Sequence, residues 1–239
     1  MSDSQIGKRI VILGGGTAGW ITANAMINSW ADKGYEITLI ESPEVGTVGV
    51  GEGSTPRMKI FFDSIGVQES EWMPRCNATY KNGISFANWS TRPGFDRYFH
   101  PFSSQLDRYT KTAFYFNTYA RRMGIDVHAH PNRFFLAAKL SENRQAPRPN
   151  ENFPFIVEYG YHFDAKLVGD FLKERAKSLG VRHIEAKIVD VRQSAEGNIT
   201  KLLSDAEETI EGDFFVDCSG FRGALIQKTM GVWLSLIHI

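Results

Sequence analysis

The sequence is poor in cysteine and has no long hydrophobic run. Only two cysteines, Cys76 and Cys218, occur among the 239 residues, and they lie far apart. This argues against a disulfide-based secreted scaffold and predicts free thiols in a reducing compartment. No apolar stretch approaches the ~20 residues of a membrane span, and no apolar region precedes the first predicted strand, so we expect neither a membrane span nor a signal peptide. These absences predict a cytoplasmic protein.

The sequence also lacks an excess of charge of either sign. It has 27 basic and 27 acidic residues, so its formal net charge is zero. A nucleic-acid-binding surface is therefore not expected to be its main function. Its hydrophobic content of 42% is typical of a chain that buries a normal core. The 17 phenylalanines suit a pocket for a flat ligand, and equally the filling of a core.

Residues 9–20 predict a short buried strand, a glycine turn and the start of a helix. The turn has the G-x-G-x-x-G spacing, in which the first glycine allows a tight turn and the second lets the backbone approach a pyrophosphate. The third glycine lets the helix pack on the strand, so that amides at the helix N-terminus point at phosphates. We predict that five residues here contact a dinucleotide: Gly14, Gly16, Thr17, Ala18 and Gly19. The alternative is a glycine-rich turn with no ligand.

A second predicted strand, residues 35–41, ends in an acid. Glu41 lies about 20 residues beyond the last glycine of the turn, the separation at which a carboxylate takes the ribose hydroxyls. The following residues, 43–56, hold four glycines and two prolines and are expected to be a loop without regular structure. In open α/β sheets, ligands bind where such strands end.

Residues 214–230 repeat the opening pattern of apolar strand, small-residue turn and helix. Asp217 and Gly220 would bring a carboxylate and a close backbone approach to the other half of a dinucleotide. A helix-capping acid is the alternative for Asp217. Two such units, separated by a long mixed insertion, suit FAD better than NAD, because a simple NAD fold would continue with further βαβ units.

The remaining elements follow from periodicity and from glycine and proline positions. We predict helices at 18–32, 55–65, 69–75, 112–123 and 164–180, the last capped by Asp164, and a loop at 146–154. Further strands are predicted at 83–89 and 155–159. Residues 181–205 are expected to form a strand and then two strands at 187–191 and 199–203 that are joined by a turn at 196–198. The expected fold is α/β: an FAD-binding Rossmann-like sheet of the glutathione-reductase type, with a mixed α+β insertion.

Several separate stretches resemble the flavin-dependent halogenases, typified by the tryptophan halogenases. They are the motif GGGTAGW at 14–20, VGVGEGST at 48–55, CNATYK at 76–81, YHFDA at 161–165 and DCSGFRG at 217–223. The resemblance implies one FAD-binding domain over 1–239, with nucleotide-binding elements 8–56 and 155–231 and an inserted substrate-side segment 57–154. It also implies that a C-terminal portion is missing. The ending VWLSLIHI at 232–239 has no helix cap and no polar face, as expected of a chain cut off in mid-domain, and whether these residues are native stays open.

The resemblance implies the chemistry of Lys81. Reduced FAD, delivered by a separate flavin reductase, gives hypohalous acid from O2 and a halide ion, and the lysine relays the oxidant to an electron-rich aromatic such as tryptophan or another indole. A lysine suits this step because its ammonium can hydrogen-bond hypohalous acid and its amine form can carry the halogen. An ordinary surface lysine is the alternative that composition alone would favour.

The resemblance also implies further site residues. Val50, Gly51 and Glu52 belong to a loop over the flavin, although Glu52 can equally be a solvated loop acid. His100 and Phe102 resemble positions that sandwich an indole ring, although both can equally belong to a core. No metal site is predicted, because no acid or cysteine cluster supports the His128–His130 pair.

Two other functions stay open at this stage. A flavin-dependent aromatic hydroxylase would share the fold but would bind NAD(P)H itself and would not need Lys81. A flavin-binding fragment without turnover is expected if the chain lacks the rest of the active site, which in this family supplies a second carboxylate and the halide-binding stretch.

Overall fold

The computed structural model describes residues 8–46 and 51–233, and the chain divides into two compact units. The first unit comprises residues 1–50, 64–77 and 164–239, and the second comprises residues 51–63 and 78–163. Segments far apart in the sequence therefore share a unit. The expectation of a single domain with a 57–154 insertion stays a prediction.

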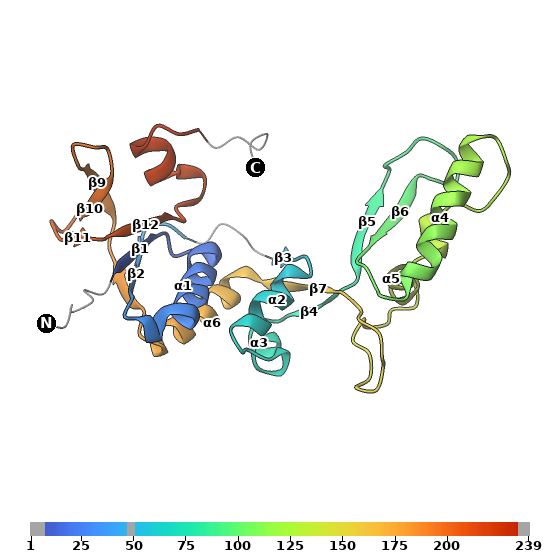
Figure 1. The fold of residues 1–239 in the computed structure, drawn as a ribbon, viewed down its shortest axis with the longest axis horizontal. Helices are drawn as coiled ribbons and strands as arrows, with labels where there is room; N and C mark the ends of the chain where they lie inside the picture. The colour runs from blue at the N-terminus through green and yellow to red at the C-terminus, as the bar shows by residue number, and fades with distance from the viewer. Residues whose placement is uncertain (1–7, 47–50, 234–239) are drawn as a thin grey trace, which may run out of the picture. The chain divides into compact units, whose positions relative to one another are not determined.

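A parallel four-stranded sheet, in the order β12-β1-β2-β8, forms the centre of the first unit (Figure 1). The strands of this sheet are β1 (Arg9–Leu13), β2 (Glu36–Glu41), β8 (Arg182–Glu185) and β12 (Phe214–Asp217). The helices of the unit are α1 (Thr17–Trp30), η1 (Ala31–Lys33), α3 (Glu69–Arg75), α6 (Ala165–Ser178), η3 (Gly220–Arg222) and the π-helix η4 (Ala224–Thr229). The predicted α/β class is confirmed by this sheet.

An antiparallel sheet, β11-β10-β9, packs against the parallel sheet. Its strands are β9 (Ile188–Gln193), β10 (Ile199–Ser204) and β11 (Thr209–Glu211). Leu202 and Ile210 share a buried cluster with Val11 and Ile40. The hairpin predicted from residues 187–191 and 199–203 is confirmed by the pairing of β9 with β10, and Gly197 in its turn has a positive φ of 85°.

Helices α1 and α6 lie side by side in the first unit (Figure 1) and are joined by a buried asparagine. The amide of Asn24 donates to the carbonyl of Leu172 at 2.8 Å, and its oxygen accepts from Arg175 at 2.9 Å. The side chain is fully buried. This bond pattern satisfies both ends of a polar group that would otherwise be costly to bury. As predicted, Asp164 caps α6 by accepting from the Leu167 amide at 3.0 Å.

We expect Asn24→Ala to lower the free energy of unfolding by about 3 kcal/mol, because it leaves the Arg175 guanidinium and the Leu172 carbonyl without this partner. Urea denaturation followed by circular dichroism measures the change. Asn28→Ala, one turn further along α1, is the matched control. Asn28 makes a single exposed contact to the Ser64 carbonyl, so a loss below about 1 kcal/mol is expected. Equal losses in both variants would contradict this account.

The second unit contains a three-stranded sheet, β3-β7-β4, and an antiparallel hairpin, β5-β6 (Figure 1). Its strands are β3 (Gly51–Gly53), β4 (Thr79–Lys81), β5 (Gly83–Ala87), β6 (Arg97–Pro101) and β7 (Gly160–Asp164). Its helices are α2 (Arg57–Ser64), α4 (Asp107–Arg122), η2 (Pro131–Arg133) and α5 (Leu136–Glu142). Across residues 8–46 and 51–233, none of the helices combines the length and the apolar character that crossing a bilayer requires.

Two sequence predictions for this unit were wrong. Residues 51–53 form strand β3 where a structureless loop was expected, since backbone pairing beside β7 overrides their local glycine composition. The Ser54 amide continues this pairing by donating to the Tyr161 carbonyl at 2.8 Å. The strand expected at 155–159 begins instead at Gly160 and runs directly into the cap of α6. Strands β4 and β6 were not predicted at all.

Candidate functional site

The glycine turn after β1 is shaped by close backbone contacts. Gly14 has a φ of +122°, and a Cβ there would lie 2.1 Å from the Cys218 carbonyl oxygen. A Cβ on Gly19 would lie 1.9 Å from the Gly14 oxygen. The first and third glycines are therefore required by the protein itself, the first for a turn against β12 and the third for the packing of α1 on that turn.

Gly16 differs, because a Cβ there would meet no protein atom within 4 Å among the described residues. It is also the N-cap of α1, so the helix begins without a side-chain cap, and its first turn holds no acid. The first amides of a helix have no partner within the helix, and with the helix dipole they attract anions. The open space at Gly16 and the uncapped helix start, which carries Thr17 and Ala18, fit a pyrophosphate.

Glu41 ends β2 and lies against the glycine turn. A Cβ on Gly15 would fall 2.3 Å from the Glu41 carboxyl carbon and 2.6 Å from its Cβ. Gly15, which the sequence analysis left without a role, therefore makes room for this acid. Oε2 of Glu41 accepts from Lys173 Nζ and contacts His183 Nε2, both at 3.0 Å. The structure thus places Glu41, the residue predicted to bind the ribose, beside the glycine turn that is predicted to bind the pyrophosphate.

Asp217 holds its own turn together. Its Oδ1 accepts from the amide and hydroxyl of Ser219, and its Oδ2 accepts from the amides of Leu225 and Ile226. Burial opposes ionisation, but the Ser219 hydroxyl and these backbone amides outweigh it and hold the pKa of Asp217 below its ordinary value. The helix-capping alternative matches these bonds. A cofactor contact at Asp217 or at Gly220, which has a φ of +65°, stays a prediction.

Three predicted residues belong to the stretch over the flavin. Val50 lies outside the described residues. Gly51 begins β3, and Glu52 follows it with an exposed side chain. Because side chains alternate along a strand, Glu52 points to the face of the β3-β7-β4 sheet opposite to that of Gly53. Their roles in binding stay predictions.

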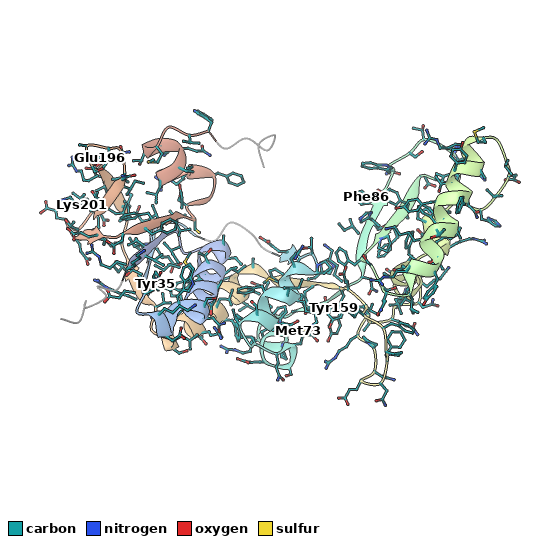
Figure 2. All side chains as sticks on the ribbon, viewed as in Figure 1. Tyr35, Met73, Phe86, Tyr159, Glu196 and Lys201 are labelled. Atoms are coloured by element: carbon teal, nitrogen blue, oxygen red, sulfur yellow. The ribbon has the colours of Figure 1, made fainter. Side chains whose placement is uncertain are left out.

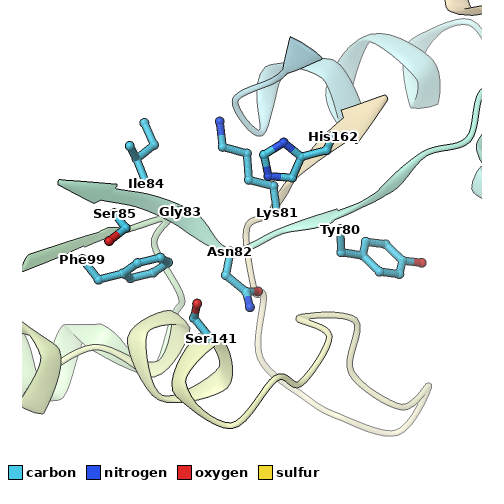
Figure 3. A pocket seen from close by; sticks show the side chains of 9 residues that line it. All are labelled: Tyr80, Lys81, Asn82, Gly83, Ile84, Ser85, Phe99, Ser141 and His162. Carbon is cyan, nitrogen blue, oxygen red and sulfur yellow. The ribbon is translucent and has the colours of Figure 1, made fainter. Parts of the chain in front are cut away.

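Lys81 lines a pocket of about 420 Å³ in the second unit (Figure 3). It ends the short strand β4, which is fixed by antiparallel pairing of Lys81 with Gly160 in β7. The ring of Phe102 lies with its centroid 5.8 Å from Lys81 Nζ, within the range of a cation–π contact. The pocket is lined by Tyr80, Lys81, Asn82, Gly83, Ile84, Ser85, Phe99, Ser141 and His162.

His162, which belongs to the motif YHFDA, is a pocket residue that was not among the predicted site residues. Figure 3 shows its ring beside the Lys81 side chain, on the same side of the strands. A Cβ on Gly53 would lie 2.8 Å from Lys81 Nζ and 3.2 Å from His162 Nδ1, so three strands converge here. Burial and the Lys81 charge lower the pKa of His162 and favour its neutral form. In the antiparallel pairing of β4 with β7, Lys81 and His162 are diagonal neighbours on one face, because His162 lies opposite Thr79. This pairing cannot be read from the sequence.

Aromatic rings continue from Lys81 along one face of the β5-β6 hairpin. Directly opposed residues of an antiparallel pair share a face, so His100 lies on the face of its partner Ile84, which points the same way as Lys81 in Figure 3. Phe86, which is labelled in Figure 2, stacks on Tyr98 with ring centroids 5.2 Å apart and an interplanar angle of 11°. Its ring meets the His100 ring edge-on at a centroid distance of 6.4 Å. The two predicted substrate residues, His100 and Phe102, are thus on the Lys81 side. Contact with a substrate stays a prediction.

Known proteins resemble this chain over nearly all its length. The tryptophan halogenase family profile matches residues 9–235. Tryptophan 7-halogenase RebH of Lentzea aerocolonigenes is 35% identical over 93% of the chain and 44% of its own length. The chain therefore spans about half the length of the curated relatives it matches.

Solved structures agree in fold. The tryptophan 6-halogenase of Streptomyces toxytricini superposes with a TM-score of 0.79 at 32% identity, over 97% of this chain and 47% of that one. A flavin-dependent halogenase from Xanthomonas campestris superposes with a TM-score of 0.80 at 36% identity, over 96% of this chain and 45% of that one. These matches confirm the resemblance expected from the sequence motifs and the Rossmann-like fold class. The chain belongs to the tryptophan halogenase family of flavin-dependent halogenases.

Proposed function

We propose that the protein catalyses flavin-dependent halogenation of an electron-rich aromatic compound such as tryptophan or another indole. Family membership supports the reaction class, and relatives named as tryptophan halogenases support an indole-like substrate. The observation that carries the proposal is Lys81, which lines a pocket and whose Nζ lies beside the Phe102 ring, on the side of the aromatic face of the β5-β6 hairpin. Because the chain covers under half of these relatives, the activity proposed is that of the whole protein.

The first unit would hold FAD. The open backbone at Gly16 and the amides at the start of α1 would take the pyrophosphate, and Glu41 would accept from the ribose hydroxyls. Reduced FAD, delivered by a separate flavin reductase, would supply the two electrons with which O2 oxidises a halide ion to hypohalous acid.

Lys81 would act on the oxidant at the aromatic ring. As an ammonium it donates a hydrogen bond to hypohalous acid and polarises the oxygen–halogen bond. As an amine it takes the halogen, releases water and presents a haloamine. In either case the halogen replaces a ring hydrogen. The aromatic face from Phe102 to Phe86 would hold a flat substrate by stacking.

The test uses the gene product at its full natural length, with FAD, a flavin reductase, NADH, chloride or bromide, and a panel of indoles. We expect products whose mass spectra show the isotope pattern of the supplied halogen, and none when the halide or the reductase is left out. A hydroxylated product without halogen would contradict the proposal and support an aromatic hydroxylase. The 239-residue chain, assayed in parallel, shows whether this part alone turns over.

A further inference from the structure

A cluster of charged and aromatic side chains surrounds Glu41 at the ends of β2 and β8. Lys173 on α6 and His183 on β8 both contact the same carboxylate oxygen, Oε2, at 3.0 Å. The indole of Trp20 on α1 completes the cluster. Its ring lies 5.3 Å from the His183 ring, and Lys173 Nζ lies 5.8 Å from its centroid. Side chains from α6 and β8 therefore converge on one carboxylate, and α1 packs a ring against both of them.

The electrostatics of the cluster assign a role to each partner. The His183 side chain is only 5% exposed, and burial and the Lys173 charge lower its pKa despite Glu41 and Glu185. A neutral ring that contacts a carboxylate must present an N–H there, so Nε2 donates to Glu41. Lys173 provides the positive charge and also lies 3.6 Å from the exposed Glu185. Both partners of Glu41 use Oε2, so Oε1 can accept from a ligand.

The position of Glu41 points to the ligand. Its side chain fills the space that a Cβ on Gly15 would occupy, so the carboxylate lies over the glycine turn. Gly16, the next residue, is the one whose Cβ would meet open space. A diol attached to a diphosphate fits this juxtaposition. A glutamate side chain has three rotatable bonds, and without such contacts it would lose conformational entropy on binding this ligand.

We propose that Lys173 and His183 are positioning residues that hold Glu41 for the adenosine ribose of the bound dinucleotide. The inference rests on the proposed function, because it takes that dinucleotide to be FAD. Lys173 and His183 fix the side-chain conformation of Glu41 before the ligand arrives, and Gly15 leaves the room for it. The two residues should therefore raise the affinity for FAD only when the ribose hydroxyls that Glu41 binds are present.

The test measures the binding of oxidised FAD to the gene product at its full natural length by flavin fluorescence, beside FAD that lacks the adenosine 2′-hydroxyl. We expect Lys173→Met and His183→Leu each to raise the Kd for FAD about tenfold, and to change the Kd for the 2′-deoxy form much less. Lys173→Arg and His183→Gln keep a donor and should recover most of the affinity. Lys177→Met, an exposed change on the same helix, is the matched control and should have no effect.

Circular dichroism melting separates positioning from folding. The proposal requires the loss of affinity in variants that melt within a few degrees of the unaltered chain. An equal loss for FAD and 2′-deoxy FAD, or an unchanged Kd for FAD, would overturn the positioning role and leave the proposed function intact. Failure of the unaltered full-length protein to bind FAD at all would overturn both.

Discussion

Lys81→Ala is expected to lower the halogenation rate of the full-length gene product by about 10³-fold or more, the range seen when a group acting on the reacting atoms is removed. FAD affinity and thermal stability should stay unchanged, because Lys81 is not among the predicted FAD contacts in the glycine turn, at Glu41 or in β3. Halogenated product is quantified by mass spectrometry at saturating indole. Lys59→Ala is the matched control, since this lysine of α2 forms an ion pair near the surface with the exposed Asp63 and does not line the Lys81 pocket.

Lys81→Arg separates the two roles available to the lysine. Arginine keeps the positive charge and the hydrogen-bond donors but does not deprotonate to an amine. Retention of a substantial part of the rate would favour hydrogen bonding to hypohalous acid, whereas loss as complete as in the alanine variant would favour the haloamine. A Lys81→Ala protein that still halogenates at the normal rate would remove the lysine from the mechanism and leave the family assignment intact.

Gly19→Ala should lower the stability of the fold, whereas Gly16→Ala should weaken FAD binding. In Gly19→Ala the new Cβ would overlap the Gly14 oxygen at 1.9 Å, a backbone atom that cannot move without opening the turn. We expect a loss of about 3 kcal/mol or more in the free energy of unfolding. In Gly16→Ala the new methyl meets open space at a φ of −71° that any residue adopts, so the melting temperature should hardly change.

The effect of Gly16→Ala should instead appear in cofactor binding. Its Cβ occupies the space through which a pyrophosphate would approach the backbone, so the Kd for FAD should rise by at least about tenfold. Melting curves and flavin fluorescence on the same samples check both expectations. A Gly16→Ala chain that binds FAD normally would show that the phosphates lie elsewhere.

The sequence was most informative where structure is local. An apolar run, a glycine turn and a helix are all encoded within residues 9–30, and β1, the turn and α1 lie where they were predicted. The role of Glu41 at the end of β2 was predicted from its separation in sequence from the glycine turn. The same reasoning failed for β3 and β4, because a three-residue strand is defined by its partner, and β7 lies about 100 residues away from β3 in the sequence.

The partners of site residues were beyond sequence reasoning for a related reason. Lys173 and His183 reach Glu41 across separations of 132 and 142 residues, and nothing in their own neighbourhoods marks them. Lys81 was identified from the motif CNATYK, because neither the composition of the chain nor its hydrophobic periodicity distinguishes this lysine from the others. Its contact with Phe102 and its proximity to His162 depend on how β4 pairs with β7 and how the hairpin follows.

Gly15 and Glu41 constrain one another in a way that extends to how this protein can vary. A side chain at position 15 would overlap the Glu41 side chain from its Cβ to its carboxyl carbon. A side chain at position 15 therefore requires that the Glu41 side chain moves or is lost, whereas loss of Glu41 creates no overlap with Gly15. The constraint has a direction in evolution, because position 15 becomes free to vary only after the acid has gone, and an engineered library should vary position 15 only together with position 41.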